Sequence, residues 1–229
     1  MKAIQLIKYG DAHTAFQTNE VPIPQLKSSD SVLIKVQAFG INFADVMARK
    51  GLYRAAPNLP AILGYEVVGI VERVNSNSNE YLIGKRVLAM TRFGGYAEYS
   101  VASCKGIIEI QDQVPIGHAL ALATQYCTAH IAIEKTSLNN NDFVLIHSAS
   151  GGVGTALTQL AKLKKCQIIG LTGTSSKKSY LKNNGVDFPI YHENNNYIKK
   201  IMDVIKSQKI SAIFNSVGGH TFKKDLELL

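Results

Sequence analysis

Residues 143–154 read FVLIHSASGGVG, an apolar run that passes directly into a glycine-rich turn. The three positions of a G-x-G-x-x-G pattern fall at 149, 151 and 154, with alanine at the first. A pyrophosphate approaches a backbone only where no Cβ intrudes, and N–H groups at the start of a helix best meet its charge. The turn therefore predicts a phosphate-binding corner formed by Ala149, Gly151, Gly152, Val153 and Gly154.

The sequence on both sides of the turn decides between two interpretations of it. A glycine pattern alone is equally well a purely structural turn. Here an apolar strand at Phe143–His147 precedes it, an amphipathic helix follows at Val153–Lys164, and a buried strand at Gln167–Thr172 completes a βαβ unit. This context favours the binding of a dinucleotide.

The end of the second strand indicates which dinucleotide is bound. A site selective for NAD places an Asp or Glu about 20 residues past the glycines, where it accepts hydrogen bonds from the ribose 2′-hydroxyl. Residues 171–178 read LTGTSSKK, which contains no acid and offers hydroxyls and two cations to a 2′-phosphate. We therefore predict NADPH, bound here by Gly173, Thr174, Ser175 and Lys177. A capped helix start, with Thr174 or Ser175 as the N-cap, is an alternative that can hold at the same time.

The pattern of apolar and polar residues changes near residue 118. Before it, short strands such as Ser31–Ala38 and Glu66–Val74, separated by polar turns, predict an antiparallel β barrel or sandwich. From residue 118 onward helices and strands alternate, which predicts an α/β doubly wound parallel sheet. The further elements expected there are helices at 119–134, 177–183 and 197–207 and strands at 186–191 and 211–215.

The number of predicted strands is smaller than a complete sheet of this kind contains. About four are expected before residue 229, where a complete fold has about six. We therefore expect the C-terminal part of the second domain to be missing, so that an unpaired apolar edge favours aggregation.

Composition limits the class of protein. The 229 residues are 46% hydrophobic and 18% charged, which predicts a globular protein. Three scattered cysteines, no signal peptide and no run of ~20 apolar residues predict a cytoplasmic protein without a membrane span. Lys and Arg outnumber Asp and Glu by 13 to 7 in residues 118–229, without basic runs interleaved with aromatic residues. This pattern favours an anionic small molecule over nucleic acid as the partner.

Further stretches resemble the zinc-independent quinone oxidoreductases of the medium-chain dehydrogenase/reductase superfamily, most closely their vesicle-amine-transport-protein-like branch. The matching stretches follow the family's order and lie at residues 40–53, 63–69, 84–87, 93–99, 149–154 and 216–219. The resemblance implies a GroES-like catalytic domain at 1–117 and a Rossmann NADPH-binding domain at 118–229. It also implies a homodimer for a full-length chain, and for the vesicle branch a peripheral contact with membranes.

The same resemblance bears on metals. Metal-dependent relatives hold zinc with a Cys in the first matching stretch and a His in a Gly-His-Glu motif, whereas this chain has Asn42 and Tyr65 in those places. The four-cysteine lobe that carries a structural zinc is also lacking. Because a zinc site needs three or four converging ligands, we predict that no metal is bound.

Without a Lewis acid, the expected substrate is already electrophilic, either a quinone or an α,β-unsaturated carbonyl (an enone), reduced by hydride from the nicotinamide. The resemblance implies that Asn42 and Asp45 lie near the nicotinamide and that Tyr53 points its phenol toward the substrate. The structural alternatives are helix capping for Asn42 and Asp45 and simple aromatic packing for Tyr53.

In the second half, the resemblance implies further cofactor contacts. Thr128 matches a threonine near the nicotinamide ribose, Tyr191 matches a tyrosine beside the adenosine phosphate, and Ser216 and Gly218 belong to the matching stretch at 216–219. The chain departs from the family before Tyr191, where one residue is lacking, and at Asn215, which stands where an Asp is usual.

Three hypotheses of function follow from the sequence. The first is a fragment of an NADPH-dependent reductase of quinones or enones. The second is a regulatory or membrane-associated protein that uses the fold without turnover. The third is an inactive truncated product.

Overall fold

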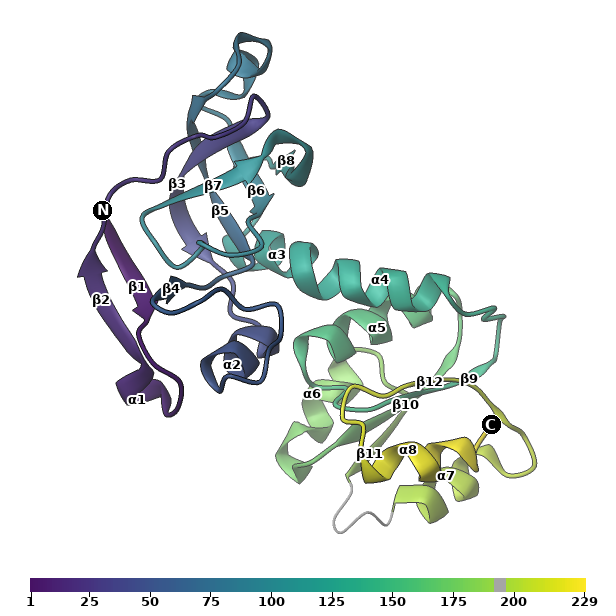
Figure 1. The fold of residues 1–229 in the computed structure, drawn as a ribbon. Helices are drawn as coiled ribbons and strands as arrows, with labels where there is room; N and C mark the ends of the chain where they lie inside the picture. Colours follow the sequence, from purple (N-terminus) through teal and green to yellow (C-terminus); the bar gives the residue numbers. More distant parts are fainter. Residues whose placement is uncertain (192–196) are drawn as a thin grey trace. The chain divides into compact units, whose positions relative to one another are not determined.

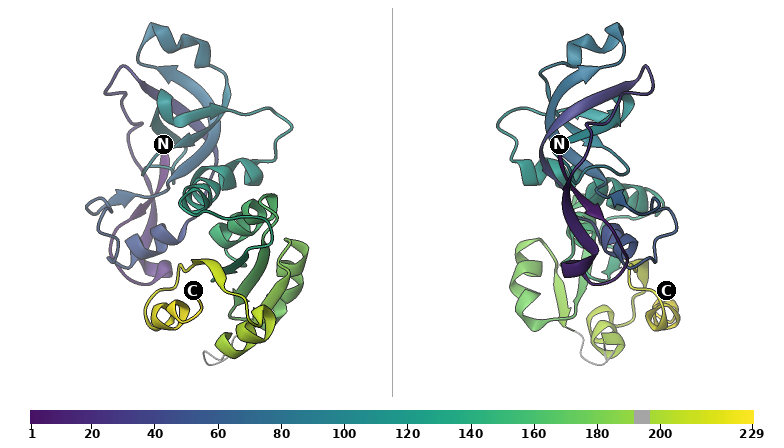
Figure 2. Two further views of the ribbon diagram at one scale, coloured as in Figure 1. Left: turned by 90° about the vertical axis from the view of Figure 1, so that its right-hand side faces the viewer. Right: turned by 60° about the vertical axis from the view of Figure 1, so that its left-hand side comes forward.

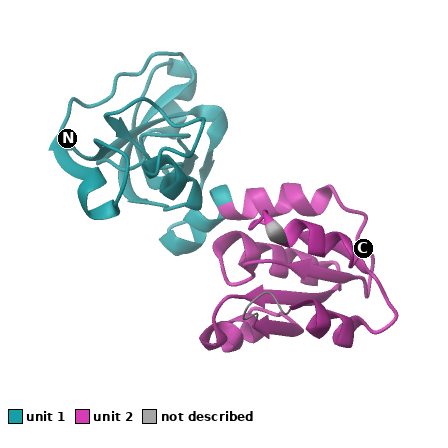
Figure 3. Ribbon diagram, turned by 60° about the horizontal axis from the view of Figure 1, so that its bottom comes forward, with its two compact units in different colours: residues 1–124 teal, residues 125–229 magenta. Residues whose placement is uncertain are grey.

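The computed structural model describes residues 1–191 and 197–229, with the backbone alone for His220. The chain forms two compact units, Met1–Thr124 and Gln125–Leu229 (Figure 3). The domain boundary predicted between residues 117 and 118 lies inside a short helix, α3 (Ile116–Ala121), close to the division between the units.

Unit 1 is built from two antiparallel sheets (Figure 1). The smaller has the order β2-β1-β4 and the larger the order β7-β3-β5-β6-β8. The strands are β1 (Lys2–Leu6), β2 (Phe16–Glu20), β3 (Ser31–Phe39), β4 (Ala61–Ile62), β5 (Glu66–Val74), β6 (Arg86–Met90), β7 (Tyr99–Ser103) and β8 (Ile107–Glu109). The antiparallel β architecture predicted for the first half is therefore confirmed.

Unit 1 also contains short helices. They are α1 (Ala12–Ala15), α2 (Phe43–Arg49) and α3, with 3-10 turns at η1 (Asn77–Leu82) and η2 (Cys104–Gly106). Val32, Ile34, Val67 and Val87 form the centre of the larger sheet's core and are completely buried. The buried side chains of β3 and β5 belong to one core, which explains why these two strands pair in this register.

Unit 2 contains a parallel sheet with the order β11-β10-β9-β12. Its strands are β9 (Phe143–Ile146), β10 (Gln167–Thr172), β11 (Phe188–Tyr191) and β12 (Ile210–Phe214). All four residues of β9 are buried, as expected of a parallel strand covered on both faces. The predicted doubly wound parallel sheet is confirmed, and the strand order reverses at β9.

Helices cover both faces of this sheet, as Figure 2 shows from two further directions. One face packs on α4 (Cys127–Glu134), α5 (Gly152–Leu163) and α6 (Lys178–Asn183) through Val144 and Ile146. The other packs through Phe143 and Leu145 on α7 (Tyr197–Ile205) and on Leu228, which follows α8 (His220–Leu226). The alternation of side chains along β9 therefore fixes which helices lie on each face.

The structure refines three predicted elements. A π-helical turn, η3 (Leu122–Tyr126), interrupts the helix expected at 119–134 and separates α3 from α4. The strand expected at 186–191 begins only at Phe188. Helix α8 follows the strand expected at 211–215 and was not predicted.

Candidate functional site

The glycine turn lies between β9 and α5 and owes its shape to close packing. A Cβ on Gly154 would lie 2.4 Å from the Ser148 carbonyl oxygen and 2.7 Å from the Ala149 Cα, and both of these atoms belong to the backbone. Ala149 is fully buried, and its N–H donates to the Leu171 carbonyl at the end of β10. Gly154 is therefore required so that α5 can begin directly against the turn.

The start of α5 supplies the groups that an anion needs. Gly151 is the N-cap and the helix begins at Gly152, and both residues are exposed. The first N–H groups of a helix have no acceptor within that helix. A phosphate that approaches the turn can accept hydrogen bonds from them, assisted by the positive end of the helix dipole.

The end of β10 is polar and open. Residues 173–178 are exposed, and no atom lies within 4 Å of the place where a Cβ on Gly173 would stand. Thr174 is the N-cap of the 3-10 turn η4 (Ser175–Lys177), but within the described residues its side chain makes no capping hydrogen bond. The hydroxyls here are therefore not used to start the helix.

The other predicted cofactor residues lie at the same edge of the sheet, with one exception. Tyr191 ends β11 and pairs with Thr172 of β10. Ser216 and Gly218 follow β12 in a loop in which Asn215 Oδ1 accepts the N–H groups of Val217 and Gly218, both at 2.8 Å. Thr128 lies instead on the exposed surface of α4.

In unit 1, Asn42 is bound to a buried carboxylate. Its Nδ2 donates to both carboxylate oxygens of Glu66, at 2.8 and 3.0 Å, and Thr124 Oγ1 donates to the same carboxylate. Glu66 is only 1% exposed. Burial raises the pKa of the Glu66 carboxyl above its ordinary value of 4.5, although the hydrogen bonds from Thr124 and Asn42 oppose this shift.

Asp45 makes contacts of a structural kind. Its Oδ2 accepts the Asn42 N–H at 2.9 Å, across the first turn of α2, and its Oδ1 accepts the Gly64 N–H at 3.2 Å. The side chain is 3% exposed. These contacts favour the capping alternative for Asp45, because they tie the start of α2 to the loop that carries Gly64.

Tyr53 belongs to an aromatic cluster with Tyr65 and Phe93. The Tyr53 and Tyr65 rings meet edge to face, with centroids 6.2 Å apart, and Tyr65 lies 5.2 Å from Phe93. Burial, followed by the hydrogen bond with Tyr53, raises the pKa of the Tyr65 phenol. The cluster therefore presents Tyr65 as a protonated hydrogen-bond donor at neutral pH.

The sequence reasoning missed Glu66. It stands at the third place of the Gly-His-Glu motif, of which only the His position was considered, and this place was the signal that could have identified it. In residues 1–191 and 197–229, no three His, Cys, Asp or Glu side chains form a group that could hold a metal ion. None of the described helices is both long and apolar enough to span a bilayer.

Both halves of the chain match known protein families. The alcohol dehydrogenase GroES-like domain matches residues 28–112, and the zinc-binding dehydrogenase family matches residues 152–229. Together with the antiparallel unit and the glycine turn on a parallel sheet, these matches define a medium-chain dehydrogenase/reductase.

Individual relatives narrow the class. Human quinone oxidoreductase is 31% identical over 231 residues, which cover 100% of this chain and 70% of the relative. A synaptic vesicle membrane protein VAT-1 homolog from Danio rerio is 32% identical over 207 residues, 90% of this chain and 42% of the relative. The chain belongs to the quinone oxidoreductase family and is an oxidoreductase.

Solved structures agree with this assignment. Escherichia coli quinone oxidoreductase, complexed with NADPH, superposes with a TM-score of 0.92 at 26% identity, covering 100% of this chain and 70% of that one. The quinone oxidoreductase from Coxiella burnetii gives 0.88 at 31% identity, covering 100% and 72%.

The buried carboxylate can be tested through the pH dependence of stability. Because the folded-state pKa of Glu66 is raised above 4.5, the folded protein keeps this proton to a higher pH than the unfolded chain does. The wild type therefore loses stability as pH rises from 4.5 to the folded-state pKa, and loses no more above it. Glu66→Gln removes this titration, so its melting temperature is expected to rise relative to the wild type across that window.

Glu72→Gln, at an exposed position of the same strand, is the matched control for the loss of one negative charge. A difference in melting temperature between wild type and Glu66→Gln that stays constant with pH, or that changes in the opposite direction, contradicts the assignment of a buried, proton-retaining carboxyl.

Proposed function

We propose that the protein is an NADPH-dependent reductase that transfers hydride to quinones or α,β-unsaturated carbonyls without a metal. The proposal rests on the residues that follow two neighbouring strands of unit 2, β9 and β10. The glycine turn after β9 accepts a pyrophosphate, and the acid-free end of β10 beside it carries exposed hydroxyls and Lys177. A 2′-phosphate finds donors and a cation there, whereas a 2′-hydroxyl finds no carboxylate.

The residues present fit this cofactor. Gly154 lets α5 begin directly against the turn, the Gln125 side chain lies beside Gly152, and Gly173 leaves open space at the end of β10. In the proposal the 2′-phosphate is held by Thr174, Ser175 and Lys177, and the adenosine side is closed by Tyr191. Ser216 and Gly218 take the nicotinamide half.

The cofactor supplies the hydride, and the side chains of unit 1 orient the acceptor. Because Asn42 Nδ2 donates to both carboxylate oxygens of Glu66, the amide is fixed in one orientation. The phenol of Tyr53 then serves as the donor to the substrate oxygen, supported by the protonated Tyr65. In this proposal Asn42 and Tyr53 touch the substrate, and Asp45 holds α2 in place.

Cofactor selectivity tests the first part of the proposal. We expect the dissociation constant for NADPH to be lower than that for NADH, because a charge-assisted hydrogen bond contributes about tenfold or more in affinity. Lys177→Ala is expected to lower the affinity for NADPH by about tenfold and to leave the affinity for NADH nearly unchanged. Lys209→Ala, an exposed lysine that precedes β12 at the opposite edge of the sheet, is the control. Equal affinity of the wild type for the two cofactors contradicts the proposal.

Turnover tests the second part. With NADPH and a quinone, loss of NADPH absorbance is expected, and Tyr53→Phe and Asn42→Ala should each lower kcat by at least about tenfold. Tyr81→Phe, at an exposed position of η1, is the control and should retain full activity. The catalytic assignment fails if both site variants turn over like the wild type.

NADPH binding without turnover on any quinone or enone would instead favour a non-catalytic role. The VAT-1 homolog among the relatives makes lipid vesicles the probe for that outcome. A peripheral membrane contact, a homodimer and a cytoplasmic location stay predictions from the sequence.

A further inference from the structure

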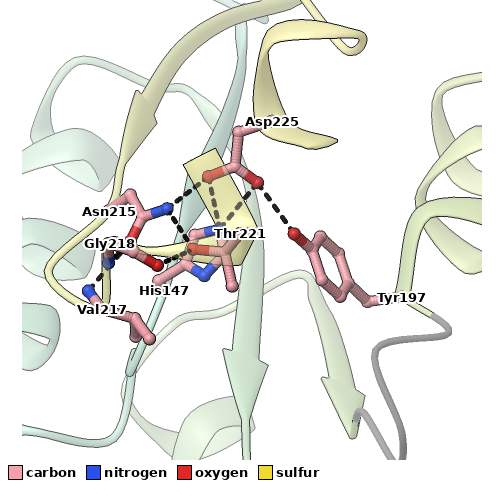
Figure 4. A network of polar contacts seen from close by, with 7 residues as sticks. All are labelled: His147, Tyr197, Asn215, Val217, Gly218, Thr221 and Asp225. Atoms are coloured by element: carbon pink, nitrogen blue, oxygen red, sulfur yellow. Dashed lines mark hydrogen bonds and ion pairs between the residues drawn. The ribbon is translucent and has the colours of Figure 1, made fainter. Parts of the chain in front are cut away.

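A buried carboxylate on α8 gathers donors from three other parts of unit 2 (Figure 4). Asp225 is 4% exposed, and its oxygens lie 3.0 Å from Nε2 of His147, at the end of β9, and 3.1 Å from the hydroxyl of Tyr197 in α7. Asn215 Nδ2, after β12, donates to it as well. The Tyr197 hydroxyl and the Asn215 amide donate to this carboxyl group from two different parts of unit 2.

Asn215 links this carboxylate to the loop that follows β12. Its Nδ2 also donates to Thr221 Oγ1 at 2.8 Å, and Thr221 Oγ1 donates in turn to the Gly218 carbonyl at 2.8 Å. Its Oδ1 accepts the N–H groups of Val217 and Gly218. The side chains of Asn215 and Thr221 therefore hold the loop at 215–219, and Asp225 accepts a hydrogen bond from Asn215.

This loop has no regular structure of its own to keep its shape. Gly218 and Gly219 both have positive φ, +68° and +61°, which leaves the backbone free to adopt other conformations when its restraints are lost. The restraints are the polar contacts of Asn215 and Thr221. Their loss is expected to change the conformation of the loop but not the packing of the sheet, because Asn215 and Thr221 do not belong to its core.

The strand order assigns this loop to one half of a dinucleotide. Strands β10 and β12 lie on opposite sides of β9. A dinucleotide whose pyrophosphate meets the turn after β9 and whose adenosine phosphate meets the end of β10 must extend its other half toward β12. The loop at 215–219 therefore faces the nicotinamide half and not the adenosine half.

Asn215 and Asp225 pair an amide with a buried carboxyl group. Asn215 stands where an Asp is usual in the family that the sequence resembles, and the carboxylate of this chain lies across from it, on α8. Carboxylates at both positions would face each other in a buried site, where like charges disfavour joint ionisation. A carboxylate at position 215 would also lack the hydrogens that Asn215 donates to Thr221 and Asp225.

We propose that Asp225 is a positioning residue which, through Asn215, holds the loop at 215–219 in the form that binds the nicotinamide half of the cofactor. The inference rests on the proposed function, since it concerns the same NADPH site.

Two ligands separate positioning from stability. NADPH contacts both halves of the site, whereas adenosine 2′,5′-bisphosphate contains only the adenosine half. Asp225→Asn and Asn215→Asp are each expected to lower the affinity for NADPH by about tenfold. Each should change the affinity for the bisphosphate by less than about twofold. The double variant Asn215→Asp/Asp225→Asn restores one amide and one carboxylate, and should recover most of the NADPH affinity.

Thr221→Val is the second variant, because it cuts the link between Asn215 and the Gly218 carbonyl without changing a charge. It should lower the affinity for NADPH more than that for the bisphosphate, and this test remains available even if the Asp225 variant does not fold. Asp203→Asn, at an exposed position of α7, is the control for the loss of a negative charge.

The outcomes distinguish the inference from the function on which it rests. If the wild type binds both ligands and the variants weaken both equally, or neither, Asp225 does not position the loop and the inference is overturned. If the wild type binds neither ligand, the proposed function itself fails. Selective loss of NADPH with recovery in the double variant supports the inference.

Discussion

The close approach of α5 to the end of β9 is the constraint on which the rest of unit 2 depends. Gly154 allows it, since any Cβ there would collide with the backbone of Ser148 and Ala149. With the helix seated on the turn, Ala149 is buried and hydrogen-bonded to the end of β10, and the residues that begin α5, Gly151 and Gly152, are exposed. The same edge then carries the ends of β10, β11 and β12, where the other polar residues of the site gather.

Both units use the same device to hold a functional segment. In unit 1 the amide of Asn42 donates to the buried carboxylate of Glu66, and in unit 2 the amide of Asn215 donates to that of Asp225. In each case the donor side of an asparagine is fixed by a buried carboxyl group, so the orientation of its acceptor oxygen is set as well. Removing one partner leaves an unsatisfied buried group, which makes such pairs sensitive to substitution.

The fold was largely predictable from the sequence, because the strand at 143–147, the glycine turn and the alternation after it are local patterns. The interruption of the helix near Leu122 and the helix at His220–Leu226 were not, since nothing in the local pattern separates a π turn or a short polar helix from its surroundings. For the site, the glycines and the lysine after β10 are contiguous in sequence and could be found. Glu66 was missed although its place in the Gly-His-Glu motif marked it, and its contact with Asn42, 24 residues away, forms only in the folded chain. Asp225 could not be found, because its partner Asn215 lies 10 residues away and meets it only in the folded chain.

The central claim is that this edge of the parallel sheet holds NADPH, and hydrogen exchange with and without the cofactor tests it most directly. Because bound phosphates and fixed loops slow the opening of backbone amides, we predict that NADPH protects residues 149–156, 173–178 and 215–219 together. The strands of the larger sheet in unit 1, such as β5, should exchange as before. Binding of NADPH that leaves residues 149–156 unprotected would contradict the account.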